Sequence, residues 1–215
     1  MERHERHGEE AGLTKGRVES LTDGIFGFAM TLLVIGVGLP GDPTPAAGMA
    51  VGSIVLDLVP DFVHYVIAFL ILARFWMSHH IQFARIEWID RRILWINMMS
   101  LLFVALVPFS TSLMGDYPAN TEASVIFDAN MMIIGLLYLW QWRYASHDGR
   151  FVGQHLDRLT IETATRTNIV IPFLSVVGIV LALVGVPWTS LIYIAAPALI
   201  IVARRWNERA SRSAK

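Results

Sequence analysis

The sequence predicts an all-α integral membrane protein with six transmembrane helices, and three observations lead to this fold class. Charged residues make up only 16% of the 215-residue chain, whereas soluble domains contain about 25%. Six stretches are apolar over roughly the length that a helix needs to cross the hydrocarbon core of a bilayer. The lysines and arginines fall at alternate connections between these stretches, as they do in multi-pass membrane proteins.

The first apolar stretch, residues 18–39, is expected to be a retained membrane helix rather than a secretory signal peptide. The apolar region of a signal peptide is about 7–15 residues long, and this stretch is longer and contains Asp23. An ionised Asp at the bilayer centre is disfavoured by roughly 2.5–3.5 kcal/mol, so Asp23 is expected to have polar partners. Gly24 and Gly27, three residues apart, indicate close packing of this helix.

Five further spans follow in order, at residues 54–76, 93–113, 125–143, 167–186 and 188–203. Pro108, Pro172 and Pro197 lie inside three of these spans, where neighbouring helices satisfy the backbone groups that a kink releases. We therefore expect one transmembrane domain over residues 18–203, flanked by cytoplasmic tails at 1–17 and 204–215. The sequence shows neither a soluble module nor an internal repeat.

The positions of the charges predict the orientation of these spans. The 17 lysines and arginines lie before the first span, around the second and fourth connections, and after the last span. The first, third and fifth connections carry Asp42, Asp57, Asp116 and Glu122 instead. Because basic residues are retained on the cytoplasmic side, both termini are expected to be cytoplasmic.

Several functional classes lack their motifs in this chain. Neither GxxxxGK[ST] nor GxGxxG is present, which leaves nucleotide and cofactor binding without support. GxSxG and HExxH are also missing, as is the potassium filter sequence TVGYG, and we expect neither an enzyme nor a carbonyl-lined filter. Adjacent His79 and His80 point about 100° apart on a helix, so hydrogen-bonded interfacial histidines are favoured over a metal site.

A helical wheel separates two faces of the first span. At about 100° per residue, one face gathers Arg17, Leu21, Gly24, Phe28, Thr31, Leu32 and Ile35. Apart from Arg17, this face is apolar with a single hydroxyl, at Thr31. It fits a surface that faces lipid or another helix, and it also fits a pore lining that needs several copies of the chain around a symmetry axis.

Asp23 lies about 140° away from Phe28 on the same wheel. It is expected to point into its own bundle, towards polar groups of the second and third spans: Trp76, His79, His80 and Asn97. A buried Asp in such a network fixes helix orientation or takes part in an ion or proton path. The sequence leaves both roles open.

The chain also resembles a known family. The segment "RVESLTD" resembles the RxxxFSD signature that opens the first helix of the transmembrane protein 175 potassium channels. The segments "FWMSHHIQF", "LWINMMSLLFVALVPFSTSLMG" and "NMMIIGLLYLWQWRYA" match later helices in the same order, and the resemblance extends from about Arg17 to residue 203.

The resemblance implies a prokaryotic six-span subunit that forms a homotetramer, with the first helix of each copy lining a central cation pathway. The family's apolar constriction falls on Phe28, Leu32 and Ile35, and its pore-facing threonine falls on Thr31. Its structural polar network falls on Arg17, Thr22, Asp23, Trp76, His79 and Asn97. Leu21 and Thr22 replace the usual Phe and Ser, and Phe28 replaces the Ile or Leu of the narrowest ring.

The resulting hypothesis is a passive potassium-permeable cation channel in a prokaryotic plasma membrane. Potassium ions, lipid and further copies of the chain are the expected partners, with no nucleic acid, cofactor or resident metal. A proton pathway through Asp23 with His79 or His80 is the first alternative. A non-conducting structural membrane protein is the second.

Overall fold

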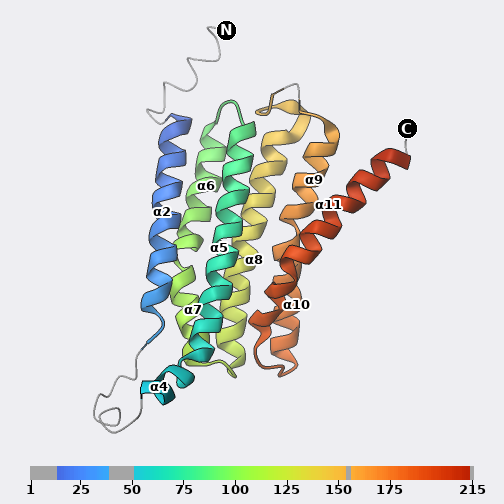
Figure 1. Cartoon of the computed structure of the whole chain (residues 1–215). Helices are drawn as coiled ribbons and strands as arrows, with labels where there is room; N and C mark the ends of the chain where they lie inside the picture. Colours follow the sequence, from blue (N-terminus) through green and yellow to red (C-terminus); the bar gives the residue numbers. More distant parts are fainter. Residues whose placement is uncertain (1–13, 39–50, 154–155, 214–215) are drawn as a thin grey trace.

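A computed structural model describes residues 14–38, 51–153 and 156–213, and the described chain is an all-helical bundle (Figure 1). Its helices are, in order, α2 (Lys15–Ile35), α4 (Val51–Asp57), α5 (Val59–Arg85), α6 (Arg91–Ala105), α7 (Val107–Asp116), α8 (Thr121–Ser146), η1 (His147–Gly149), α9 (Arg158–Asn168), α10 (Val170–Leu183), η2 (Thr189–Ala195) and α11 (Ala196–Ser213).

Six continuous or kinked helices are long and apolar enough to cross a membrane, which confirms the predicted number of spans. They cover Lys15–Ile35, Val59–Arg85, Arg91–Asp116, Thr121–Gly149, Arg158–Leu183 and Thr189–Asn207. The second span continues to Arg85 rather than ending near residue 76, because a helix extends past its apolar part wherever its polar residues find partners. The fifth span begins at Arg158 for the same reason, with Asp157 capping α9 through a bond from the Thr160 N–H.

Prolines accompany the breaks inside three spans. Pro108 follows the break at Leu106 that separates α6 from α7, and Pro172 follows the break at Ile169 between α9 and α10. Pro197 lies at the start of α11, directly after η2. A proline removes one backbone donor and its ring crowds the preceding turn, so each of these spans bends where the sequence places a proline.

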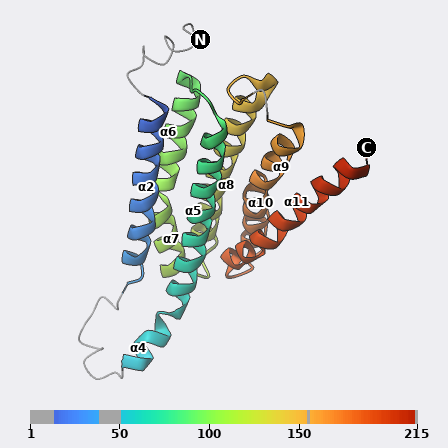
Figure 2. The same cartoon turned by 45° about the horizontal axis from the view of Figure 1, so that its top comes forward.

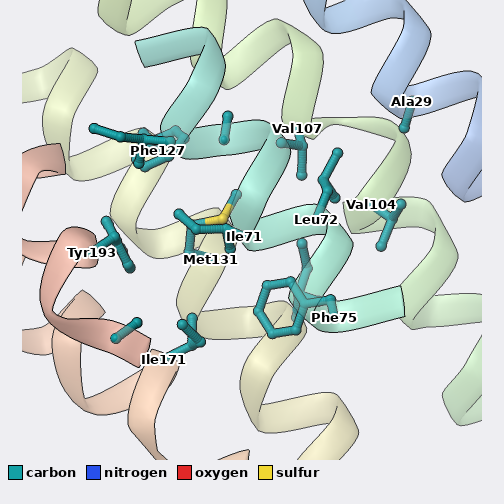
Figure 3. Packing of buried hydrophobic residues seen from close by; sticks show 14 of the residues in the cluster. Ala29, Ile71, Leu72, Phe75, Val104, Val107, Phe127, Met131, Ile171 and Tyr193 are labelled. Atoms are coloured by element: carbon teal, nitrogen blue, oxygen red, sulfur yellow. The ribbon is translucent and has the colours of Figure 1, made fainter. Parts of the chain in front are cut away.

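The bundle is held together by one long apolar core (Figure 3). Ile71, Leu72 and Phe75 of α5 meet Met131 of α8 there, and all four side chains are buried. A second cluster lies where α2 begins and α5 ends, and it includes Phe83 and Trp142. There the Glu87 N–H donates to the Phe151 carbonyl at 2.8 Å, joining two connections on the same end of the bundle.

Helix α2 lies at one edge of the bundle, and α11 slants away from the opposite edge (Figures 1 and 2). α2 packs on α5, α6 and α7, all on one of its sides. Both α2 and α11 have their polar ends at the same end of the bundle, as an even number of crossings requires. The edge position leaves most of the α2 surface uncovered within one copy of the chain.

Candidate functional site

One side of α2 is buried against its own bundle. The buried positions follow one another at intervals of three or four residues: Val18, Thr22, Phe26, Ala29 and Leu33. This spacing places them on a single helix face, centred about 120° around the axis from Phe28. Ile25 and Met30 are partly buried against the same core, and the exposed positions of α2 are available to lipid or to another copy of the chain.

The four residues predicted to line a pore lie on or beside this uncovered side. Phe28 is 66% exposed and Ile35 is 73% exposed, and Thr31 is also exposed. Leu32 is half-buried, because it lies about 40° around the helix from Phe28 towards the buried face. A single copy of the chain therefore presents a row of bulky apolar side chains with one hydroxyl among them.

The hydroxyl of Thr31 is oriented by the helix itself. It donates to the Phe28 carbonyl at 2.8 Å, one turn earlier. Since the hydrogen is used within the helix, the Thr31 oxygen keeps its acceptor capacity for a group outside it.

Asp23 has the partner that the wheel proposed but a different environment. The Trp76 indole Nε1–H donates to Asp23 Oδ1 at 2.8 Å, which joins α2 to α5. The Trp76 ring in turn stacks on His80 at 5.9 Å between ring centroids. Asp23 itself is exposed rather than enclosed in the bundle, because the buried face of α2 passes through Thr22.

Thr22 connects α2 to the buried polar residues. The Asn97 side-chain amide donates to Thr22 Oγ1 at 3.1 Å, and the Thr22 hydroxyl donates to the Val18 carbonyl at 2.9 Å. His79 is only 2% exposed, adjoins Asn97 and stacks on Phe83 at 4.1 Å. His79 and His80 thus lie in different surroundings, as their helical spacing predicts.

The predicted polar residues therefore divide into two groups along α2. One is the exposed Asp23–Trp76 pair, and the other is the buried group of Thr22, Asn97 and His79. Arg17 lies in the first turn of α2 and is exposed. In the part of the chain that the structure describes, no three His, Asp, Glu or Cys side chains are grouped to hold a metal ion.

The sequence analysis did not single out Asp128, which is fully buried in α8. Its Oδ1 accepts from the Tyr193 hydroxyl at 2.7 Å, and its Oδ2 accepts from the Thr189 hydroxyl at 3.5 Å. Gly178 leaves room for the carboxylate, since an added Cβ there would lie 2.5 Å from Asp128 Oδ2. The sequence did contain a signal for this residue, because Asp128 is an acidic residue inside the predicted span 125–143.

Comparison with known families and proteins gives consistent matches. A family model described as "Endosomal/lysosomal potassium channel TMEM175" matches residues 17–108, a range that contains every pore and polar-network residue named above. A Chamaesiphon minutus protein named as a potassium channel is 28% identical over 178 residues, which are 81% of this chain and 87% of that protein. A Danio rerio protein named "Endosomal/lysosomal proton channel TMEM175" is 33% identical over 73 residues, which are 34% of this chain and 14% of that protein.

The fold is matched as well. The crystal structure of a TMEM175 homologue from Chamaesiphon minutus, described as a lysosomal potassium-selective channel homologue, superposes with a TM-score of 0.75. It is 24% identical and covers 88% of this chain and 97% of its own. Its opening helices match the TMEM175 family model in sequence and its six spans match a TMEM175 homologue in fold, so this multi-pass membrane protein is similar to the TMEM175 channels.

Proposed function

We propose that this protein is a passive, potassium-permeable cation channel in which four copies of α2 surround a central pathway. The Chamaesiphon relative carries the name of a potassium channel, and this chain covers most of that protein's length. The proposal assigns Phe28, Leu32 and Ile35 to apolar constrictions and Thr31 to the level between them. It also places both termini in the cytoplasm of a prokaryote.

The observation that carries this proposal is the uncovered apolar row on α2 with a single oriented hydroxyl. Phe28 and Ile35 are the most exposed apolar side chains of the helix, although α2 is anchored to the bundle by its other face. An apolar constriction makes a hydrated ion shed water. Potassium holds its water more weakly than sodium does and passes more readily, and four Thr31 oxygens partly replace what is lost.

Phe28 adds an electrostatic element to this constriction. An aromatic ring has a negative face that attracts cations. A ring of four phenyl groups forms an apolar barrier. Where the side chains turn their faces towards the axis, the same ring also attracts cations.

Gly24 and Gly27, two of the three glycines of α2, support assembly of several copies. An added Cβ at Gly24 or Gly27 would meet no other atom of the described residues within 4 Å. Since no described residue of the same chain packs closely on these two glycines, the close approach that such pairs permit between membrane helices is left for a neighbouring copy.

The test is ion flux into liposomes that contain the purified protein. Thr31→Ala and Leu32→Ala are expected to reduce the potassium-to-sodium permeability ratio by about two- to tenfold, which corresponds to losing an interaction of about 0.5–1.5 kcal/mol. Val34→Ala is the matched control, because Val34 is exposed on α2 but lies about 120° around the helix from Phe28. An unchanged ratio in both variants contradicts the proposed lining.

A proton pathway is the second candidate, and the contact of Asp23 with Trp76, which stacks on His80, favours it. The Danio relative carries the name of a proton channel. Currents that reverse at the proton potential, and that Asp23→Asn abolishes without loss of assembly, would support this candidate over potassium conduction. Assembled protein that passes no cation would instead indicate a structural role.

A further inference from the structure

A basic cavity opens between α5 on one side and α9 and α11 on the other. Its volume is about 370 Å³, and three arginines line it: Arg74 and Arg85 of α5, and Arg204 of α11. In both views α11 slants away from α5 towards its C-terminal end (Figures 1 and 2). The Asn207 amide fixes this slant by donating to Thr163 Oγ1 of α9 at 2.7 Å.

The positive charge of the three guanidinium groups is only weakly compensated by the residues that the structure describes. Among the described residues, none of the three forms an ion pair with a carboxylate. Arg204 repels both Arg74 and Arg85, and among the described residues Asp157 is the carboxylate that attracts Arg85. Like charges gathered at the edge of a membrane protein favour an anion between them.

The wall of the cavity offers uncharged polar groups beside these charges. Gln82 is 2% exposed, and its Nε2 donates to Ser78 Oγ at 3.4 Å. Its Oε1 has no hydrogen-bond partner among the described residues. The Ser78 hydroxyl in turn donates to Asn168 Oδ1 at 2.5 Å. Such a wall suits a hydroxyl-bearing group next to a phosphate.

An apolar groove continues from the basic cavity along α5. Its volume is about 440 Å³, and it shares Arg74, Ile81 and Arg204 with the cavity. Its other lining is almost entirely aliphatic, with Ile71 of α5 and Ile200 of α11 among the residues. Lining residues on α5 run from Ile67 to Arg85, which is about 27 Å at 1.5 Å per residue. That length spans the hydrocarbon of one leaflet, about 15 Å, and its headgroup region.

We infer that this cavity and groove together bind an anionic phospholipid. The phosphate lies among Arg74, Arg85 and Arg204, the headgroup hydroxyls meet Gln82 and Ser78, and one acyl chain follows the groove. Arginine suits the phosphate because its planar guanidinium donates two parallel hydrogen bonds. A phosphatidylcholine headgroup is disfavoured because its own cation would face three others. This inference does not depend on the proposed conduction.

The experiment measures lipid retention by the full chain with native mass spectrometry. The protein is extracted from vesicles that contain phosphatidylglycerol and phosphatidylcholine in equal parts. Phosphatidylglycerol is expected to be the retained lipid. Arg74→Gln and Arg204→Gln each reduce its retention by about tenfold, as the loss of a charge-assisted hydrogen bond predicts. Arg74→Lys and Arg204→Lys keep the charge and restore part of the binding.

The matched control is Arg205→Gln. Arg205 follows Arg204 on α11 and is exposed, but it lines neither cavity, so its removal changes the net charge equally and leaves retention unchanged. Soluble glycerophosphoglycerol, which lacks acyl chains, is expected not to compete. Equal retention of both lipids, equal loss in Arg205→Gln, competition by the soluble headgroup, or crosslinks showing that a second copy covers the groove would each overturn the inference.

Discussion

At the scale of single residues, two acids inside membrane spans are stabilised in different ways. Asp23 stays exposed on α2 and receives one bond, from Trp76. Asp128 is fully buried and relies on Tyr193 and Thr189. A buried carboxylate without its donors would carry an uncompensated desolvation cost, so the hydroxyls around Asp128 belong to the structure of the bundle.

Tyr193→Phe is expected to destabilise the protein by about 1–3 kcal/mol, because it leaves Asp128 Oδ1 buried without its closest donor. Tyr138→Phe provides the control. The Tyr138 hydroxyl is buried with no hydrogen-bond partner among the described residues, so its removal is expected to be neutral or stabilising. Thermal unfolding of both variants in the same detergent measures the difference. A similar loss of thermal stability in both variants would contradict a stabilising role for the Tyr193–Asp128 hydrogen bond.

At the scale of helices, α8 and α10 approach each other closely. An added Cβ at Gly135 would lie 2.6 Å from Cδ and Cγ of Pro172, closer than van der Waals contact allows. The proline that bends the fifth span thus rests directly on the backbone of the fourth. The Pro172 ring occupies the space that a side chain at position 135 would fill, so its packing on α8 requires the glycine.

Gly135→Ala is therefore expected to lower stability by about 1–3 kcal/mol, because the rigid proline ring cannot move aside without shifting α10. Gly16→Ala in the first turn of α2 is the control, since its added Cβ meets nothing within 4 Å. The melting temperatures of the two purified variants test this. A Gly135→Ala protein as stable as the control would mean that α8 and α10 separate freely.

At the scale of the whole molecule, charge separates the two ends of the bundle. Arg91 and Arg92 begin α6, next to the connection from α5, whereas the connection between α7 and α8 lies next to Asp116 and Glu122. The positive-inside rule predicts that the basic end lies in the cytoplasm. In this predicted orientation, the arginine cavity opens towards the cytoplasmic leaflet.

The orientation is testable because the chain contains no cysteine, so one introduced thiol is the only target for labelling. Tyr117→Cys, in an exposed position between α7 and α8, is expected to react with a membrane-impermeant maleimide added to intact cells. Arg92→Cys is expected to react only after the cells are permeabilised. The reverse pattern would contradict cytoplasmic termini.

The sequence by itself determined the six spans, their order, their kinks at proline and the apolar row on α2. Hydropathy, helical period and proline chemistry are local properties, so a window of about twenty residues contains the information. The helical wheel and the family resemblance also named Trp76 among the candidate partners of Asp23, 53 positions away in sequence, though not the exposure of the pair.

Only the tertiary structure decided which polar groups are buried and which distant charges meet. It buried Thr22 rather than Asp23, enclosed Asp128, and brought Arg204 of the last helix to Arg74 of the second span. Burial and electrostatic potential depend on how all the helices pack around one another. The hydropathy of a segment does not depend on which other segments pack against it, so the arginine cavity could be identified only from the assembled bundle.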